Sequence, residues 1–522
     1  MNSLVLAFRK NRSRLVISLI LILLLLLAIQ GMETKDWVTT LLRGFSVAAV
    51  TFLVAAGFSL IFGLLDVLNM AHGALFMIGA YVAWTVYIRP DTFIDVLTPI
   101  LLLAAGFTLM PLWDFLSQRL ANKAIISRAW PWIGLILGGV VVWYALRSYP
   151  ITIWDPGVFS NAPGTYSVFA DSGERMIPAP VPFGNQSALL VLAGILLGGF
   201  LLAFSLAGLQ NKARFGEQKK LRLPWPYLVS FLVILLVGIL VFLFNTPLTT
   251  AMVALGSNWL FLIAIVIALA AGVLLGILIE STMIRPLYAR PIYQLMITIG
   301  VSFVSLDLVR AIWGRPELTM PKPVLFNMTG GNCPATSLAD LIQYHCSTIL
   351  LMGSRIRVYN EIFIPLVGVL VLIGIWVLLQ RTRIGMIIRA GVQDREMVEA
   401  LGINVRQTFT FVFALGVGLA TFGGALAGPS MGISTGMGEN LLLNMLVALA
   451  IGGLTSYPGA AVGSLLVGLM QQFIIKYGQI GIQLPFMTEA FKPTPPLVPA
   501  STVLLMVIIL LVLPNGLLGR KE

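Results

Sequence analysis

Long apolar runs recur along the chain and predict membrane-spanning helices. They lie near residues 15–30, 44–65, 73–88, 97–113, 131–146, 188–209, 226–244, 259–280, 294–312, 361–379, 407–428, 441–455, 457–475 and 499–514. A helix needs about 20 apolar residues to cross a bilayer, and most runs approach that length. The runs are continuous rather than alternating, which argues against a transmembrane barrel. The pattern predicts an all-α, polytopic transmembrane helical bundle.

The composition agrees with a chain that lies in lipid. Of its 522 residues, 58% are hydrophobic and 10% are charged, against about 25% charged in soluble domains. An ordinary soluble enzyme, a disordered chain and a nucleic-acid-binding module are therefore excluded. The net charge of +12 is typical of cytoplasmic loops, which collect Lys and Arg. We expect membrane lipid as a partner and no nucleic acid.

The basic segments predict the orientation of the chain. Arg9–Arg14 is basic and precedes an apolar run without a small-x-small cleavage pattern, so we expect a retained first helix with a cytoplasmic N-terminus. Alternating the runs from there puts the strongly basic loops on one side. These are 117–128, 210–223, 281–292, 380–406 and the C-terminal tail. Both termini are thus expected in the cytoplasm.

The chain has two cysteines, Cys333 and Cys346, both in the polar loop 313–360 on the opposite predicted side. A disulfide across so short a loop contributes about 3 kcal/mol in the chain-entropy model. Such a pair favours an oxidising compartment such as a periplasm. Whether the two residues are bonded stays open in the sequence. With no further cysteine, a thiolate metal site is not expected.

Two apolar helices, one near each end of the chain, are interrupted by Gly, Pro or polar residues and then restart. The first interruption, Gly63–Gly73, contains Asp66, Asn69, His72 and Gly73. The second, Gly452–Ala460, contains Gly453, Ser456, Pro458 and Gly459. Interrupted segments at corresponding places in two halves indicate a translocation pathway, because freed backbone groups must face protein or cavity water. We predict that these eight residues lie along the pathway.

Asp66, Asn69 and His72 follow one another at three-residue intervals within an apolar hairpin. A carboxylate inside a membrane costs about 3 kcal/mol on insertion scales, so it calls for a reason. The residues could line the path of a solute. Alternatively, they satisfy the open backbone at the break or lie at the cytoplasmic interface. Both interpretations stay open.

The cytoplasmic segment 380–406 contains a predicted amphipathic helix. Residues 393–401 are strong helix formers with mixed charges, and Met397, Val398 and Leu401 are spaced as one helical face. Gly402 supplies a C-terminal stop. A short charged amphipathic helix suits docking to a partner protein, although a solvated loop with ordinary cytoplasmic charges is the alternative.

No enzyme signature is present. The sequence has no Gly-x-x-x-x-Gly-Lys-Ser/Thr loop to hold a nucleoside triphosphate, no Gly-x-Ser-x-Gly and no His-Glu-x-x-His. We therefore expect no catalytic residues, no metal and no cofactor in this chain.

Several segments resemble, in family order, the permeases of branched-chain amino acid ABC importers. Gly57–Tyr81 reads GFSLIFGLLDVLNMAHGALFMIGAY and resembles the first family signature. The others are Glu280–Ala289 (ESTMIRPLYA), Ile297–Phe303 (ITIGVSF), Arg389–Val405, Phe413–Gly428, Leu449–Gly468 and Leu513–Gly519. Together these cover roughly residues 40–90 and 255–522.

The resemblance implies a type II-like importer permease in a bacterial inner membrane. Its implied partners are a second homologous permease subunit, two cytoplasmic ATPase subunits that carry ATP and Mg, and a periplasmic substrate-binding protein. In that family the Glu-Ala-x-Gly loop contacts the ATPase, which here implies Glu399, Ala400 and Gly402. The coupling residues expected around them are Arg389, Asp394, Arg395 and Glu396.

The chain departs from the family pattern in two ways. Family members commonly carry an acid after His-Gly, where this chain has Ala74. Residues 91–255, including an extracytoplasmic loop 147–187, have no counterpart and are interpreted as an insertion between segments 1–90 and 256–522. Branched-chain or related amino acids are the first expected solutes. Urea or short amides, an ion-coupled secondary transporter and a membrane enzyme that uses Asp66 and His72 are the alternatives.

Overall fold

The computed structural model of the protein describes residues 22–519 except 24–25, 27, 30, 121–125, 150–186, 212–224, 289, 316, 394, 401, 403 and 484–488. Within that part of the chain, ten helices are long and apolar enough to cross a membrane, and three shorter apolar helices accompany them. The short ones are His72–Ile88, Met437–Gly452 and Leu497–Val512. The protein is therefore an all-α, multi-pass membrane protein, as the apolar runs predict.

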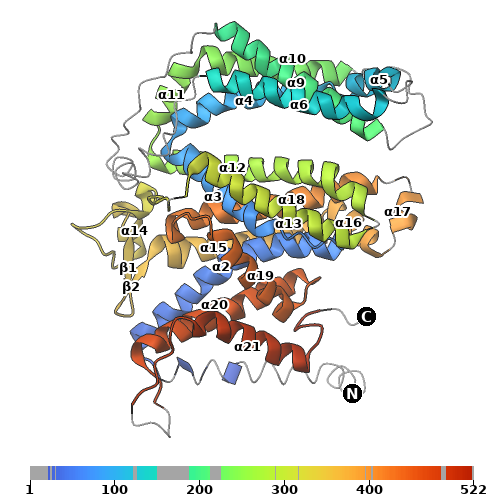
Figure 1. Cartoon of the computed structure of the whole chain (residues 1–522). Coiled ribbons are helices and arrows are strands. Elements are labelled where there is room, and N and C mark those ends of the chain that lie inside the picture. The colour runs from blue at the N-terminus through green and yellow to red at the C-terminus, as the bar shows by residue number, and fades with distance from the viewer. Residues whose placement is uncertain are drawn as a thin grey trace. The chain divides into compact units, whose positions relative to one another are not determined.

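The chain divides into two compact units. The first comprises residues 1–87, 160–171 and 257–522, and the second comprises 88–159 and 172–256. The apolar helices of the first unit, long and short, are α2 (Thr34–Leu65), α3 (His72–Ile88, its last residue in the second unit), α12 (Ser257–Ile279), α13 (Pro291–Trp313), α15 (Ile364–Arg381), α18 (Val405–Met431), α19 (Met437–Gly452), α20 (Tyr457–Ile480) and α21 (Leu497–Val512) (Figure 1).

The core of the first unit forms where α2 crosses α18 and α20 at glycines. A methyl group added to Gly57 would lie 3.1 Å from the carbonyl carbon of Gly416 on α18. One added to Gly468 on α20 would lie 2.7 Å from the amide nitrogen of Ala48. Small residues let helix backbones approach closely, which drives helix association where lipid removes the hydrophobic force. The middle of α2 is consequently buried from Ala48 to Ile61.

One end of the first unit carries a small folded cap. It contains the 3₁₀ turn η3 (Val324–Phe326), the helix α14 (Leu338–Tyr344) and the antiparallel strands β1 (Thr348–Leu351) and β2 (Ser354–Arg357). Thr348 pairs with Arg357 and Leu351 with Ser354. A π-helical turn, η4 (Val358–Phe363), leads from β2 into α15. We call this end of the unit the cap end.

The opposite end carries two short amphipathic helices, α16 (Arg383–Gln393) and α17 (Arg395–Ala400). Ile388 of α16 packs into a buried cluster with Phe52 and Leu60 of α2 and Val412 of α18. We call this the coupling-loop end. At the same end, α12 continues into the π-helical turn η1 (Glu280–Ile284) and the 3₁₀ turn η2 (Arg285–Leu287).

The second unit is a helical bundle of its own. It contains α4 (Pro90–Thr108), α5 (Met110–Leu120), α6 (Ile126–Ser148), α9 (Ala188–Asn211), α10 (Trp225–Leu243) and α11 (Asn245–Ala254). Helices α4 and α9 meet where Gly199 lies against Leu103. A buried Arg89–Asp91 ion pair (2.8 Å) and a hydrogen bond from Asn245 to Asp95 (2.7 Å) brace the start of α4.

The helices follow the apolar runs closely, with two differences. The run 97–113 is not one helix, because α4 ends at Thr108 and α5 begins at Met110. Pro111 explains the interruption, since its ring would clash with the carbonyl of residue 107 in a continuous helix. The short helix α11 has no separate apolar run. Most of the first run, and the predicted extracytoplasmic loop from 150 to 186, lie outside the described residues.

Candidate translocation and coupling sites

The first helix break separates α2 from α3 over residues 66–71. Asp66 ends α2 in the left-handed conformation (φ 54°) and is exposed, while Asn69 and His72 are fully buried. The Oδ1 atom of Asn69 accepts a hydrogen bond from the amide of Ala71 (3.2 Å). The ring Nε2 of His72 lies 3.1 Å from the carbonyl oxygen of Val54. Two of the three polar residues therefore contact the chain's own backbone.

A hydroxyl from α13 completes the first break. Thr298 Oγ1 accepts from the amide of Met70 (3.2 Å). Its single proton is shared between two carbonyl oxygens, that of Leu295 in its own helix (2.9 Å) and that of Leu68 (3.2 Å). The side chain therefore satisfies the amide of Met70, which the interrupted helix frees, and lies within reach of the freed carbonyl of Leu68. Thr298 is itself fully buried.

The second break lies between α19 and α20. Gly453 ends α19 with φ 111°, a backbone conformation that favours glycine. Ser456 caps α20, because its hydroxyl accepts from the amide of Gly459 (3.1 Å). Pro458 is exposed in the first turn of α20, where its missing N–H is tolerated. Gly453 and Gly459 are buried.

The C-terminal segment 513–519 packs onto the second break. The amide of Leu517 donates to the carbonyl of Ile451 and that of Leu518 to the carbonyl of Gly452, each at 2.9 Å. A methyl group added to Gly453 would lie 2.6 Å from the amide nitrogen of Gly519. The backbone of the tail therefore satisfies the last carbonyls of α19.

The second break lies against the last turns of α2, the helix that leads into the first break. Ser59 Oγ on α2 donates to the carbonyl of Leu454 (3.2 Å). A methyl group added to Gly63, one turn further along α2, would lie 3.4 Å from the carbonyl oxygen of Thr455. Segments almost 400 residues apart in the sequence are thus neighbours.

The predicted coupling segment is helical and packs on this same region. Val398 of α17 is buried against Val405 and Phe409 of α18, with Leu65 and Tyr288 in the same cluster. Gly402 has φ 80°, as a helix stop requires. Since Leu65 is the last residue of α2, an apolar contact joins the coupling segment to the start of the first break.

The coupling residues whose side chains the structure describes lie on the surface. The Nη1 atom of Arg389 donates to Gln380 (2.8 Å), and Glu399 and Ala400 are exposed. Asp394 and the side chains of Arg395 and Glu396 lie outside the described residues.

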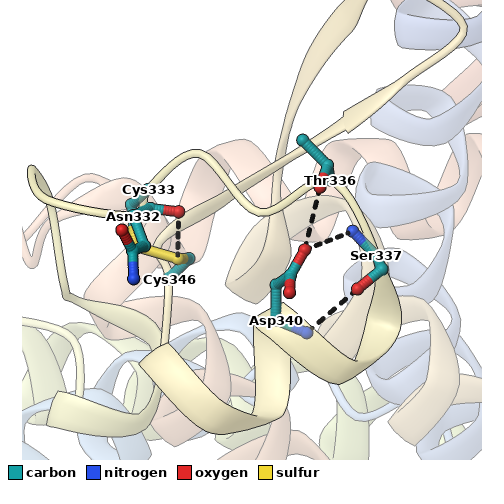
Figure 2. Close-up of a disulfide and its surroundings, with 6 residues drawn as sticks. All are labelled: Asn332, Cys333, Thr336, Ser337, Asp340 and Cys346. Carbon is teal, nitrogen blue, oxygen red and sulfur yellow. Dashed lines mark hydrogen bonds between the residues drawn. A yellow bond between two sulfur atoms is a disulfide. The ribbon is translucent and has the colours of Figure 1, made fainter.

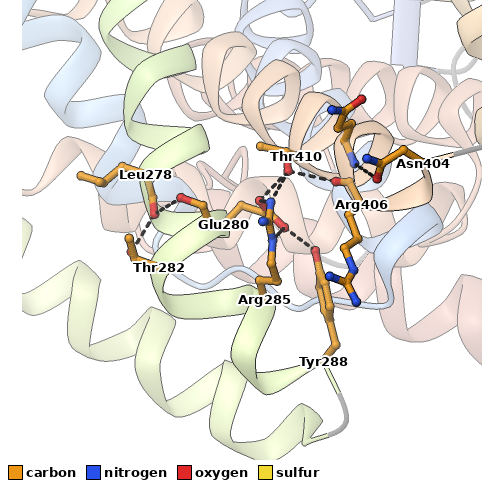
Figure 3. A network of polar contacts seen from close by, with 10 residues as sticks. Leu278, Glu280, Thr282, Arg285, Tyr288, Asn404, Arg406 and Thr410 are labelled. Carbon is orange, nitrogen blue, oxygen red and sulfur yellow. Dashed lines mark hydrogen bonds and ion pairs between the residues drawn. The ribbon is translucent and has the colours of Figure 1, made fainter. Parts of the chain in front are cut away.

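A buried carboxylate, Glu280, organises the coupling-loop end (Figure 3). Arg285 pairs with Glu280 Oε2 at 2.9 Å, and the hydroxyl of Tyr288 donates to Oε1 at 2.7 Å. The hydroxyl of Thr410 on α18 donates to Oε2 at 2.7 Å and accepts from Arg285 Nη2 at 2.7 Å. Glu280 therefore ties η1 and η2 to α18, next to the cluster that holds Val398.

The comparisons with known proteins show the family of the chain. The model of a family described as the permease component of branched-chain amino acid transport systems matches residues 193–513, more than half of the chain. The chain belongs to this family. The match begins within 91–255, so residues 193–255, where the sequence suggests no counterpart, are included in it.

Three relatives of the permease are informative. The high-affinity branched-chain amino acid transport system permease protein BraD of Pseudomonas aeruginosa is 31% identical over 172 residues, 33% of this chain and 51% of that protein. The corresponding protein LivH of Escherichia coli is 26% identical over 278 residues, 52% of this chain and 79% of that protein. The fructose import permease protein FrcC of Rhizobium meliloti is 28% identical over 152 residues, 28% of this chain and 42% of that protein.

The permease chain thus spans about half the length of BraD and about four fifths of LivH. No solved structure is significantly similar to it.

The cap of the permease is closed by a disulfide between Cys333 and Cys346, whose Cα atoms are 5.5 Å apart (Figure 2). Beside it, the side chain of Ser337 accepts from the amide of Asp340 (3.1 Å), and the Asp340 carboxylate accepts from Thr336 (2.8 Å) and from the amide of Ser337 (3.1 Å). The hydrogen bonds from Thr336 and Ser337 hold the pKa of Asp340 below its ordinary value. This capping box fixes the start of α14.

The cap is also anchored to α2. The carboxylate of Glu361 is buried and accepts from Arg43 Nε on α2 (3.0 Å) and from the amide of Arg357 (2.8 Å). Burial, and then the charge of nearby Arg357, lower the pKa of Lys322 in the same loop. Helix α2 consequently spans the whole first unit, from the cap to the coupling segment.

Sequence reasoning alone does not single out Glu280 or Thr298 as site residues. Both lie in segments that resemble family signatures, Glu280–Ala289 and Ile297–Phe303. The available signal is an acid and a hydroxyl at the edge of or within long apolar runs, where polar groups need partners. Their partners, Thr410 and the amide of Met70, lie more than 100 residues away in the sequence and cannot be identified without the fold.

Proposed function

We propose that the chain is the permease subunit of an ATP-binding-cassette importer that carries branched-chain or related amino acids across a bacterial inner membrane. One observation carries the proposal: the second helix break lies against the last turns of α2, which lead into the first break, and the predicted coupling segment packs on the end of that helix through Leu65. A movement of α17 would then be transmitted directly to the start of the first break through the contact with Leu65.

The proposal includes partners that this chain lacks. A second homologous permease subunit would complete the pathway, and two cytoplasmic ATPases would bind ATP and Mg and contact α16 and α17. A periplasmic binding protein would deliver the solute at the cap end. The disulfide supports a periplasmic cap, because such bonds persist in oxidising compartments. The basic loop at the other end supports a cytoplasmic coupling segment and cytoplasmic termini.

The mechanism follows from the contacts of the permease. Closure of the ATPases on ATP would move α16 and α17, whose buried residues Ile388 and Val398 share clusters with α2 and α18. Movement of α2 would act on the hydrogen bonds at the first break and on the Ser59 contact with the second. Solute released between two permeases would then face the cytoplasm.

Reconstitution tests the proposal. The permease, its partner permease and the ATPases would be purified together, placed in liposomes with the binding protein, and assayed for uptake of labelled leucine. We expect uptake that requires ATP, and an E399K variant that hydrolyses ATP with little uptake, because its charge reversal lies on the exposed face of α17. A matched control is E489K, an acid on the loop after α20.

Two results would point elsewhere. Uptake by the purified chain in a proton or sodium gradient, without ATPases, would support a secondary transporter. ATP-dependent uptake of urea or short amides in place of leucine would support the alternative solutes. The similarity to the fructose permease makes fructose a further solute to test in the same liposomes.

A further inference from the structure

A small hollow opens beside the first helix break, away from the contacts described above. It is lined by Gly73, Ala74, Met77, Ser302, Leu306, Thr435, Gly438, Glu439 and Leu442. These residues come from α3, α13, the start of α19 and the loop before it. Since Ser302 and Leu306 lie near the middle of α13, which is a candidate membrane span, the hollow lies between the cap end and the coupling-loop end.

Close contact of two glycines forms the wall of the hollow. Gly73 is the second residue of α3 and Gly438 is the second residue of α19. A methyl group added to Gly438 would lie 3.4 Å from the amide nitrogen of Ala74, and one added to Gly73 would lie 3.1 Å from the carbonyl carbon of Gly438. Glu439 is therefore brought next to Ala74 by the backbones themselves.

The polar groups that line the hollow are hydrogen-bond acceptors, one carboxylate and two hydroxyls. Among the described residues that line it, Glu439 is the only charged one, Ser302 and Thr435 add two hydroxyls, and none is cationic. Within the described residues, these three side chains form no hydrogen bond or ion pair. Glu439 is exposed and lies in the first turn of α19, where the helix dipole favours negative charge.

An unpaired carboxylate halfway along a transmembrane bundle is costly and indicates a functional site. A carboxylate and two hydroxyls match the donors of a primary ammonium group, and the free volume of about 20 Å³ holds that group alone, with the rest of the solute outside the hollow. We propose that Glu439, with Ser302 and Thr435, binds the ammonium group of the transported solute beside the first helix break. The site rests on the proposed function only for the identity of that solute.

The position of Glu439 also bears on Ala74, which stands where family members commonly carry an acid after His-Gly. Ala74 itself lines the hollow, so the chain holds an acid there from a different helix. Loss of the Glu439 charge should then weaken binding of the solute, while the permease should still assemble with the ATPases.

Two measurements test the site on the full chain. In the reconstituted importer, E439Q should lower kcat/KM for leucine uptake about tenfold or more, as expected for loss of a hydrogen-bonded ion contact. E439D should retain more uptake than E439Q. The matched control is D307N, which neutralises an exposed acid on α13 outside the hollow and should behave as wild type.

The second measurement does not depend on transport. The purified chain in vesicles of phosphatidylcholine and phosphatidylglycerol is labelled with a carboxyl-reactive carbodiimide. Labelling of Glu439 is measured as the difference between the wild type and E439Q. Leucine and 3-methylbutylamine should protect Glu439, whereas 4-methylpentanoate, which lacks the ammonium group, should not. If leucine is not transported but the amine protects, the proposed function fails and the site stands.

The ammonium site is overturned by any of three results. These are labelling that is equal in wild type and E439Q, protection by sodium ions alone, and uptake in E439Q that equals uptake in D307N.

Discussion

The two helix breaks solve the same problem with different parts of the chain. At the first, side chains satisfy the freed backbone: Asn69 bonds the amide of Ala71, and Thr298 reaches across from α13. At the second, serine hydroxyls bond the amide of Gly459 and the carbonyl of Leu454, but the carbonyls at the end of α19 are satisfied by backbone, the amides of Leu517 and Leu518. Gly453 and Gly519 allow this by lying in close contact.

The difference teaches which break can adjust. Rotamers and single hydroxyl bonds can change with a small movement of one helix, whereas two backbones in contact at glycines must move together. We therefore expect the first break, which also contacts the coupling cluster through Leu65, to respond to partner motion. We expect the second break and the tail packed on it to move together as one piece.

The largest expected effect is at the second break. G453A should destabilise the protein by about 3 kcal/mol, because an alanine at φ 111° is strained and its methyl group would lie 2.6 Å from the Gly519 nitrogen. Thermal unfolding in detergent measures the loss. G436A is the matched control, since no atom lies within 4 Å of an added methyl group and φ is −87°. Equal midpoints for the two variants would contradict a backbone-packed break.

The second-largest effect is expected at Glu280, which ties η1 and η2 to α18. E280A should cost somewhat less, about 2–3 kcal/mol, because it leaves Arg285 without its buried partner and removes the acceptor for Tyr288 and Thr410. It should also lower uptake per ATP hydrolysed, since Tyr288 belongs to the cluster that holds Val398. S281A alters an exposed hydroxyl in the same turn and is the control. If uptake per ATP hydrolysed is unchanged in E280A, the contacts of Glu280 play no part in coupling ATP hydrolysis to uptake.

The hydroxyl of Thr298 gives a smaller, more local effect. T298V removes a partner from the amide of Met70 and from the carbonyl of Leu68, and should cost about 2 kcal/mol. T298S keeps the hydroxyl and should restore most of the stability. If valine and serine variants unfold at the same temperature, the first break does not depend on that side chain.

Much of this arrangement is predictable from the sequence, because the apolar runs and the Gly-rich breaks are local features. The helix 393–401 with its stop at Gly402 is an example: α17 spans Arg395–Ala400, and Gly402 has positive φ. The run 97–113 is a counter-example, because its continuous apolar character predicts one helix, whereas the chain is interrupted beside Pro111.

The contacts between distant segments are not predictable in the same way. The sequence shows Asp66, Asn69 and His72 as one set of equally spaced residues, yet Asp66 is exposed while the other two are buried. The separation arises because α2 ends at Asp66 and the chain turns back along it, so that His72 lies near Val54. Likewise, the partners of Glu280, Thr298 and Gly453 come from other helices or from the tail, and only the fold brings them together.

The smallest expected effect tests whether the two breaks act as one unit. S59A removes the hydrogen bond to Leu454 and should cost about 0.6 kcal/mol, typical of such bonds within membranes. If α2 transmits movement from the first break to the second, the T298V and S59A effects on uptake should not be additive, because both variants act on the same displacement. A double-mutant cycle on uptake and on unfolding measures this coupling. Additive effects on uptake would mean that the breaks are neighbours in space but move independently, and that the contact of Ser59 with Leu454 is only structural.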